Sequence, residues 1–209
     1  VAQACGLMHI EHEQRNPMRT TSYGVGLLVA DALRHNCHKM IIGLGGSATS
    51  DAGIGMLRAL IDTFAPEDHF NAIRPLFDNC EVILASDVTN PLYGINGAAH
   101  VFAKQKGATP SMIEALDARA KQFVLHTKRA MGFDKSRQPG AGAAGGLGYA
   151  FMQFLNAKMQ SGAELLLHLL QFDKLLAHAD IVITGEGKSD CQTLMGKLPA
   201  VIMQHARQH

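Results

Sequence analysis

Apolar residues occur along this chain in two patterns, short continuous runs of strand length and longer segments with helical spacing. The runs lie at residues 40–42, 81–85 and 180–184. The pattern predicts helices at residues 1–6, 23–34, 56–60, 70–76, 110–130, 162–176 and 198–207, with a short extended piece at 7–10. Strands that alternate with helices are typical of α/β folds with a parallel sheet, so we expect that class here.

Each predicted strand runs into a loop rich in glycine, hydroxyl and acidic residues. These loops are residues 43–55, 86–91 and 185–193. In an α/β sheet all three can lie at the carboxyl edge, where ligands bind. This recurrence predicts a shared site more strongly than any single motif does.

The loop at residues 43–55 has the composition of an anion-binding turn. Gly45 and Gly46 permit a positive φ and a close approach of a ligand to the main chain. With Ser47 and Thr49 ahead of a predicted helix, they place donors where a phosphate or carboxylate can be held. The spacing matches neither the P-loop nor the dinucleotide fingerprint. A tight strand-to-helix turn with a hydroxyl cap is the alternative interpretation.

Acidic residues in the other two loops are candidates for chemistry. Asp87 and Asn90 stand where α/β sheets contact a metal, a phosphate or a hydroxyl, although an Asp-x-x-Asn-Pro segment also closes a turn. The third loop and the residues after it bring acids, lysines and hydroxyls together, at Gly185, Glu186, Gly187, Lys188, Asp190, Thr193 and Lys197.

Two further segments have both a functional and a structural interpretation. Arg15, Arg19, Thr20 and Thr21 could grip a small carboxylate, with arginine supplying the fork geometry, or could form a helix cap with two surface arginines. The glycine cluster at 139–148 could admit a ligand, or could be the close-packed start of a helix.

Composition and charge exclude several classes of protein. The 209 residues are 47% hydrophobic and 18% charged, with a formal net charge of +1, which gives no pull toward nucleic acid. No apolar run has membrane-spanning length and the start has no signal-peptide pattern, so we expect a cytoplasmic protein with no membrane partner. The four cysteines form no C-x-x-C pair, so we expect reduced thiols.

Six segments in order resemble the class I glycerate kinase family. They are RNPMRTT at 15–21, IGLGGSAT at 42–49, DVTNPL at 87–92, QKGAT at 105–109, PGAGAAGG at 139–146, and TGEG at 184–187 continuing to Gln192 and Thr193. Six ordered blocks over most of the chain are far more specific than one loop.

The resemblance implies a fold of two α/β domains, a Rossmann-like domain with a second domain inserted in it. We expect residues 1–180 to be mainly the inserted domain, and 181–209 to be a strand, loop and helix returning to the Rossmann-like domain. Parts of the family at both ends are then absent from this sequence. The implied reaction is transfer of the ATP γ-phosphoryl group to D-glycerate, assisted by Mg²⁺, with 2-phosphoglycerate as product.

On the hypothesis that the protein transfers a phosphoryl group, we assign a role to each candidate residue. Gly45, Gly46, Ser47 and Thr49 hold an anionic group, either the ATP phosphates or the glycerate carboxylate. Asp190 orients or deprotonates the hydroxyl, Asp87 and Asp51 hold Mg²⁺, Lys197 or Lys188 offsets charge, and Arg19 clamps the carboxylate. The remaining residues assigned to substrate or phosphate are Thr20, Asn90, Gly185, Glu186, Gly187 and Thr193. Open alternatives are a 3-phosphoglycerate product, a non-catalytic anion-binding module, and a sugar-phosphate isomerase. A homo-oligomer is possible.

Overall fold

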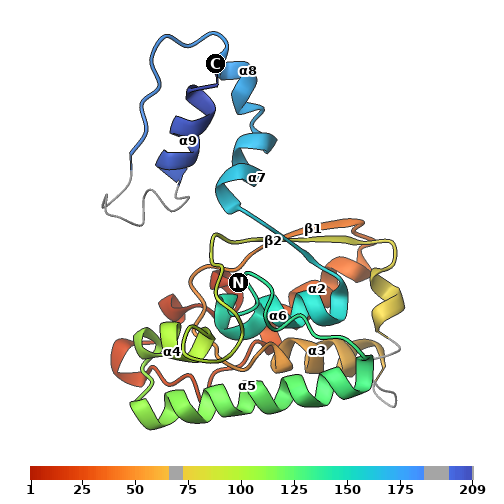
Figure 1. Ribbon diagram of the computed structural model, residues 1–209. Coiled ribbons are helices and arrows are strands. Elements are labelled where there is room, and N and C mark those ends of the chain that lie inside the picture. The colour runs from red at the N-terminus through yellow and green to blue at the C-terminus, as the bar shows by residue number, and fades with distance from the viewer. Residues whose placement is uncertain (66–72, 186–197, 209) are drawn as a thin grey trace. The chain divides into compact units, whose positions relative to one another are not determined.

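The computed structural model describes residues 1–65, 73–185 and 198–208 of the chain (Figure 1). The chain divides into two compact units, Val1–Met159 and Gln160–His209, which are described separately. The assignment of residues 1–180 to an inserted domain and of 181–209 to a returning Rossmann-like domain stays a prediction.

The first unit combines a small sheet with a set of helices. The helices are α1 (Ala2–Cys5), α2 (Tyr23–Arg34), α3 (Ile54–Phe64), α4 (Ala98–Phe102), α5 (Pro110–Met131) and α6 (Ala143–Leu155). Short 3-10 turns are η1 (Leu7–His9), η2 (His12–Gln14), η4 (Arg74–Phe77) and η5 (Lys104–Lys106). The strands are β1 (Lys39–Gly43), β2 (Glu81–Ala85) and β3 (Lys158–Gln160), in the order β1-β2-β3.

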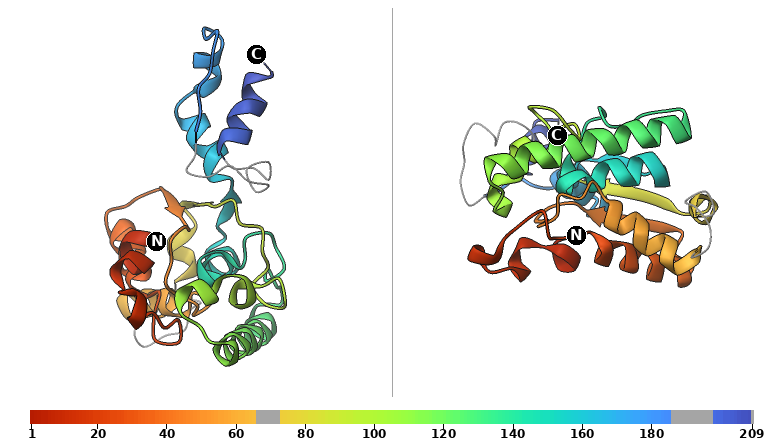
Figure 2. Two further views of the ribbon diagram at one scale, coloured as in Figure 1. Left: turned by 90° about the vertical axis from the view of Figure 1, so that its left-hand side faces the viewer. Right: turned by 90° about the horizontal axis from the view of Figure 1, so that it is seen from below.

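The two longer strands are parallel and in register from end to end. Lys39 lies opposite Glu81, and Gly43 lies opposite Ala85. Because a parallel pair needs a crossover connection, α3 follows β1 before the chain returns to β2. Figure 1 shows α3, α5 and α6 on the same side of β1 and β2, and Figure 2 shows these helices from below. The predicted α/β class and the first two predicted strands are confirmed.

The helix α5 illustrates how local sequence sets an element's bounds. Thr109 caps its start, since its hydroxyl accepts a hydrogen bond from the Met112 amide at 3.3 Å, and Pro110 takes the first helical position. Gly132 ends it in the left-handed region at φ +77°. Leu116, Val124 and Thr127 are buried and lie on the core face of this helix, whose predicted existence at 110–130 is confirmed.

Helix α6 supplies the largest part of the core. Tyr149 and Phe151 are fully buried, and the Tyr149 ring packs edge-on against Phe123 of α5. The Tyr149 hydroxyl is hydrogen-bonded to that of Thr127, and burial raises the pKa of Tyr149 to about 12. The phenol is therefore a neutral structural group at any ordinary pH.

The glycine cluster that begins α6 allows two stretches of backbone to approach closely. Gly145 has φ +67°, and a Cβ placed on it would lie 1.9 Å from the Thr49 carbonyl oxygen. The Gly145 carbonyl in turn accepts a hydrogen bond from the Ala52 amide at 3.0 Å. Of the two interpretations of this cluster, these contacts support the close-packed one, with the cluster acting as the support of the loop at 43–55.

Several predicted elements differ from the structure. Residues 74–76 of the helix predicted at 70–76 belong to the 3-10 turn η4, and residues 70–72 lie outside the described residues. Leu7–His9 form the turn η1 rather than an extended piece, with the Ile10 amide bonded to the Leu7 carbonyl. The helix predicted at 162–176 is two helices, because Gln171 adopts φ +51°. Residues 181–185 are irregular and exposed, with Ile183 at 93%, rather than a strand. A strand needs a neighbour for its backbone hydrogen bonds, and none pairs with this segment within the described residues.

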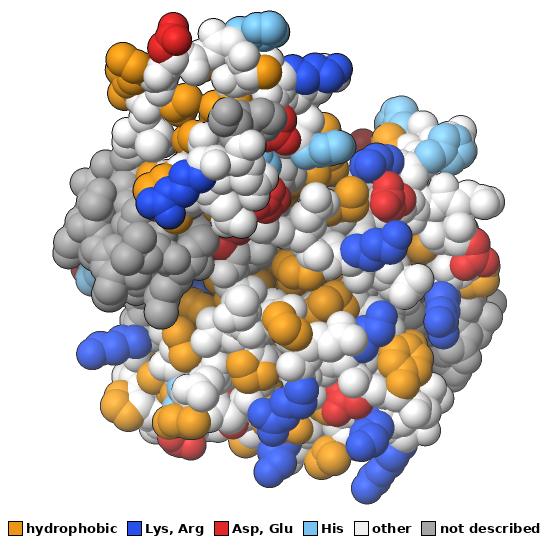
Figure 3. All heavy atoms as spheres, turned by 45° about the horizontal axis from the view of Figure 1, so that its top comes forward, with side chains coloured by type: hydrophobic (Ala, Val, Ile, Leu, Met, Phe, Trp, Pro, Cys, Tyr) orange, Lys and Arg blue, Asp and Glu red, His pale blue; other side chains and the backbone are white. Residues whose placement is uncertain are grey.

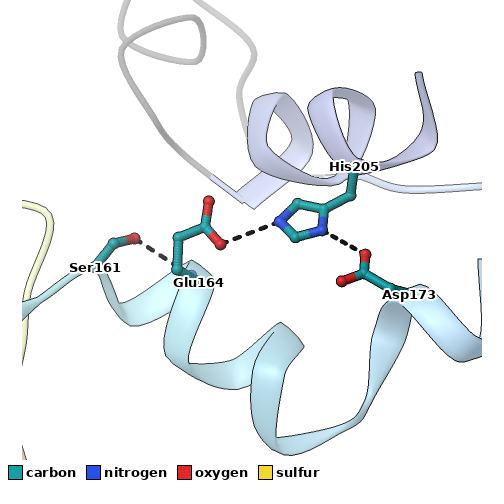
Figure 4. Close-up of polar contacts among 4 residues, drawn as sticks. All are labelled: Ser161, Glu164, Asp173 and His205. Atoms are coloured by element: carbon teal, nitrogen blue, oxygen red, sulfur yellow. Dashed lines mark hydrogen bonds and ion pairs between the residues drawn. The ribbon is translucent and has the colours of Figure 1, made fainter. Parts of the chain in front are cut away.

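The described part of the second unit contains three helices, and a histidine of the last one contacts the other two. They are α7 (Gly162–Leu169), α8 (Phe172–Leu176) and α9 (Leu198–Ala206). His205 of α9 contacts Asp173 of α8 at 2.6 Å through Nδ1 and Glu164 of α7 at 3.1 Å through Nε2 (Figure 4). Asp173, and next Glu164, hold the pKa of His205 above its ordinary range.

The charged side chains on the face drawn in Figure 3 are mixed in sign, and each described helix is too short or too polar to span a membrane. Lysine, arginine, acidic and histidine side chains are interspersed on the face drawn in Figure 3. Among the described helices, none is both long enough and apolar enough to cross a bilayer.

We expect Gly145→Ala to lower the free energy of unfolding by about 3 kcal/mol, because the added methyl group must displace the Thr49 carbonyl and a left-handed alanine is itself strained. The matched control is Gly132→Ala, which has φ +77° but open space around the new Cβ, and should cost about 1 kcal/mol. Thermal unfolding of both variants measures the difference. Equal losses would contradict the close approach.

We expect the contacts of His205 to weaken as pH rises. The folded pKa is raised above the unfolded value of about 6.5, so the stabilisation is complete below that value and is lost as pH passes the raised pKa. Hydrogen-exchange protection of α9 should therefore fall with pH, and His205→Gln should remove that dependence. His126→Gln, at an exposed position of α5, is the control. A pH dependence that survives in His205→Gln would refute the role of this histidine.

Candidate functional site

The loop after β1 lies at the carboxyl edge of the sheet. Gly46 adopts φ +73°, and its carbonyl accepts a hydrogen bond from the Leu7 amide at 3.0 Å. The Ala48 amide donates to the Cys5 carbonyl at 2.8 Å, so the N-terminal segment holds the loop on both sides of Ser47. Gly45 and Gly46 are exposed, and within the described chain their amides have no hydrogen-bond acceptor. These two N–H groups are available to a ligand.

A buried lysine lies under this loop. Lys106, at the end of η5, is 3% exposed, and its Nζ donates to the Ser47 hydroxyl at 3.0 Å and to the Thr49 carbonyl at 2.6 Å. It forms no ion pair with any residue that the structure describes. Burial lowers the pKa of Lys106 to about 8, against the opposing effect of Cys5 and Asp51. Below that pH the lysine carries a positive charge that forms no direct ion pair with a described residue.

A cavity of about 150 Å³ opens between the loop and the lysine. Its polar lining is Gly45, Gly46, Ser47, Gln105 and Lys106. Thr49 is fully buried beneath the loop. Donors and a cation with no described acidic partner suit an anionic group. We call this arrangement the Lys106 cavity.

The sequence analysis did not single out Lys106 as a buried charge, and its assignment of Lys188 or Lys197 to the transferred group stays a prediction. One signal was present in the sequence. Ala99, Ala103 and Lys106 are spaced by four and three residues, which puts them on one side of a helical segment, and all three are buried. A lysine on an apolar helical face is a candidate for a buried functional charge.

The segment at 15–21 lies beside the same loop. The Thr20 hydroxyl donates to the Ala48 carbonyl at 2.9 Å, and a Cβ on Gly107 would meet the Arg15 carbonyl at 2.1 Å. Thr20 thus holds the loop in place, while Arg19 is exposed. The role of Arg19 as a carboxylate clamp stays a prediction.

The loop after β2 reaches the same edge. Val88 lines the Lys106 cavity, and the adjacent Asp87 is exposed. Asn90 instead closes a turn, because its Nδ2 donates to the Asn96 carbonyl at 2.9 Å and its own carbonyl accepts from the Gly142 amide. These contacts favour the turn interpretation for Asn90, and the role of Asp87 stays a prediction.

The carboxylate of Asp51 is occupied by four donors. Oδ2 accepts from the Ser22 amide at 2.8 Å, the Ser22 hydroxyl at 2.9 Å and the Gly55 amide at 3.2 Å, and Oδ1 accepts from the Gly53 amide at 3.1 Å. It thereby joins the starts of α2 and α3. This geometry favours a structural role for Asp51 over the magnesium role expected from the sequence.

Metal ligands do not gather in the described part of the chain. No group of three or more histidine, cysteine, aspartate or glutamate side chains with suitable geometry occurs in residues 1–65, 73–185 and 198–208. Of the third loop, Gly185 is described, as an exposed residue. The other residues predicted there lie outside the described residues, namely Glu186, Gly187, Lys188, Asp190, Thr193 and Lys197.

The comparisons with known proteins agree with the α/β fold of this unit. The model of the Glycerate kinase family matches residues 1–69 and 66–209. The chain therefore belongs to the glycerate kinase family, which confirms the family predicted from the six segments.

Similar proteins carry names from the same family. The glycerate kinase of Halalkalibacterium halodurans is 39% identical over 226 residues, covering 100% of this chain and 60% of that protein. The glycerate 2-kinase of Escherichia coli is 38% identical, covering 100% of this chain and 59% of that protein. A crystal structure of a protein assigned as glycerate kinase 2 from Salmonella typhimurium LT2 superposes with a TM-score of 0.84 at 38% identity, over 99% of this chain and 60% of that one. The chain spans about 60% of the length of these relatives.

We expect Asp51→Asn to lower the free energy of unfolding by about 2 kcal/mol, because the amide cannot accept from all the donors that the carboxylate serves. The control is Asp31→Asn, at an exposed position on α2, which should change stability by less than about 0.5 kcal/mol. Urea unfolding provides the comparison. If Asp51→Asn left the free energy of unfolding unchanged and weakened magnesium binding, Asp51 would instead be a magnesium ligand.

Proposed function

We propose that this chain is part of an enzyme that transfers the γ-phosphoryl group of ATP to a hydroxyl of D-glycerate, forming 2-phosphoglycerate. The observation that carries the proposal is the Lys106 cavity, where a buried cation and two open amides lie at the carboxyl edge of a parallel sheet. That edge is where α/β enzymes bind their ligands. The names of the relatives supply the reaction, and the glycerate 2-kinase of Escherichia coli supports the 2-phospho product.

The chemistry requires positioning and charge neutralisation more than covalent participation by the protein. Gly45, Gly46 and Ser47 bind an anionic group of a reactant, which fixes it against the sheet edge. Asp190 orients or deprotonates the glycerate hydroxyl, and Lys188 or Lys197 offsets charge on the transferred group. Arg19 clamps the substrate.

The proposal also covers the metal ion that assists the reaction and the cellular compartment of the enzyme. When bound with ATP, Mg²⁺ neutralises charge on the phosphate oxygens. Asp87 is the residue that we assign to it, because it is an exposed carboxylate on the loop after β2. We place the enzyme in the cytoplasm, in keeping with the thiols that we expect to be reduced.

The test is an ADP-release assay on the protein with D-glycerate and ATP, with the position of the product phosphate resolved by phosphorus NMR. We expect ADP release that depends on both substrates, and a signal from 2-phosphoglycerate. Asp190→Asn should lower kcat by about 100-fold or more, as expected for loss of a general base.

Asp180→Asn, at an exposed position, is the control and should leave kcat unchanged. Glycerate-independent binding of phosphate compounds without ADP release would indicate a binding module instead. Turnover of a sugar phosphate without ATP would indicate an isomerase. Detection of 3-phosphoglycerate as the product would change only the proposed position of the phosphate.

A further inference from the structure

The size of the Lys106 cavity restricts what can occupy it. Sites that enclose drug-sized ligands have volumes of about 300–1,000 Å³, whereas this cavity measures about 150 Å³. A three-carbon acid can be enclosed in a space of this size, whereas a whole nucleoside triphosphate is too large to be enclosed in it.

The walls of the cavity also suit a small acid better than a chain of phosphates. Leu7, Leu44, Val88, Phe102 and Ala144 form the apolar part of the lining. An apolar wall does not solvate the several charges of a triphosphate, and burying a charge without a partner is costly. A ligand with one charged end and a short carbon body matches one polar end and one apolar wall.

The charge at the polar end matches a single carboxylate. Lys106 has three N–H donors, of which two are used by Ser47 and Thr49. The ammonium group has no ion-pair partner within the described residues, although burial makes an unpaired charge expensive. One carboxylate would compensate that charge and could also accept from the amides of Gly45 and Gly46.

We propose that the Lys106 cavity binds the carboxylate of the hydroxy acid substrate, and that the ATP phosphates bind elsewhere. The inference rests on the proposed function for the identity of the acid, and it assigns to Lys106 the task of anchoring the acid. Lys106 is then a determinant of specificity for a carboxylate over a neutral polyol.

The test compares Lys106→Met with Lys104→Met in steady-state kinetics of the protein. Methionine keeps the length and apolar body of lysine but removes its charge. We expect Lys106→Met to raise KM for D-glycerate by about 10- to 100-fold, the effect of losing one hydrogen bond to a charged group, with KM for ATP changed by less than about threefold. Lys104 is exposed on the same turn η5, and its variant should behave as the wild type.

A second measurement uses the wild-type protein and does not depend on how Lys106→Met folds. D-glycerate should raise the melting temperature, whereas glycerol, which replaces the carboxylate by a hydroxymethyl group, should not. The affinity for D-glycerate should fall about tenfold per pH unit above pH 8, because neutral Lys106 no longer attracts a carboxylate. Lys106→Arg keeps the charge and should remove this dependence.

The neighbours of Lys106 bear on how this pH dependence is interpreted. Cys5 from α1 and Asp51 from the loop before α3 are the titratable neighbours. Burial raises the pKa of the Cys5 thiol, so the thiol stays protonated as Lys106 loses its proton. A fall in affinity that begins near pH 8 therefore reports on the lysine.

The outcomes separate this inference from the proposed function. If Lys106→Met raised KM for ATP alone, the ATP phosphates rather than the carboxylate would occupy the cavity. If KM for both substrates were unchanged, Lys106 would have only a structural role. Either result overturns the carboxylate assignment and leaves the proposed kinase activity intact. Equal stabilisation by glycerol and D-glycerate would also overturn it. If no ADP is released but D-glycerate still stabilises the protein in a Lys106-dependent way, the kinase proposal fails and the carboxylate site is supported.

Discussion

The hydrogen bonds of the Lys106 ammonium group connect parts of the site that lie far apart in the chain. Lys106 reaches back 59 residues to the Ser47 hydroxyl and 57 residues to the Thr49 carbonyl. Burying an ammonium group is unfavourable unless it is hydrogen-bonded, so η5 and the loop after β1 must dock against each other for the charge to be tolerated. The same contacts place the ammonium group beside the open amides of Gly45 and Gly46, so the proposed ligand site coincides with this structural contact.

The sheet and the glycine cluster provide the frame for that contact. The parallel register of β1 and β2 brings the ends of both strands to one edge, so the loops that carry Ser47 and Val88 form walls of one cavity. Behind the loop, the absence of a side chain on Gly145 lets the start of α6 support the Thr49 carbonyl directly. The acceptor of Lys106 is therefore held from both sides, and this rigidity suits a site that must position a small reactant.

Two aspartates that look equivalent in the sequence have different surroundings in the structure. The carboxylate oxygens of Asp51 accept hydrogen bonds from four donors at the starts of α2 and α3. Asp51 therefore stabilises the loop and does not present a free carboxylate. Asp87 follows β2 and is exposed at the carboxyl edge of the sheet. Part of the difference arises because Ser22, 29 residues away in the chain, donates to Asp51 from both its amide and its hydroxyl.

The sequence alone determined the α/β class, the first two strands, the helix α5 and the position of the glycine-rich loop after β1. Each of these depends on local periodicity or turn chemistry, which a short stretch of residues contains. The expected strand at 180–184 was wrong because strand formation depends on a pairing partner, and none lies beside it in the described chain. Only the tertiary structure decided that Lys106 is buried against Ser47 and Thr49, that Asp51 and Asn90 are hydrogen-bonded within the fold, and that the glycine cluster packs against backbone. Those facts depend on which groups become neighbours across dozens of residues, and burial and hydrogen bonding between distant segments are properties of the folded chain.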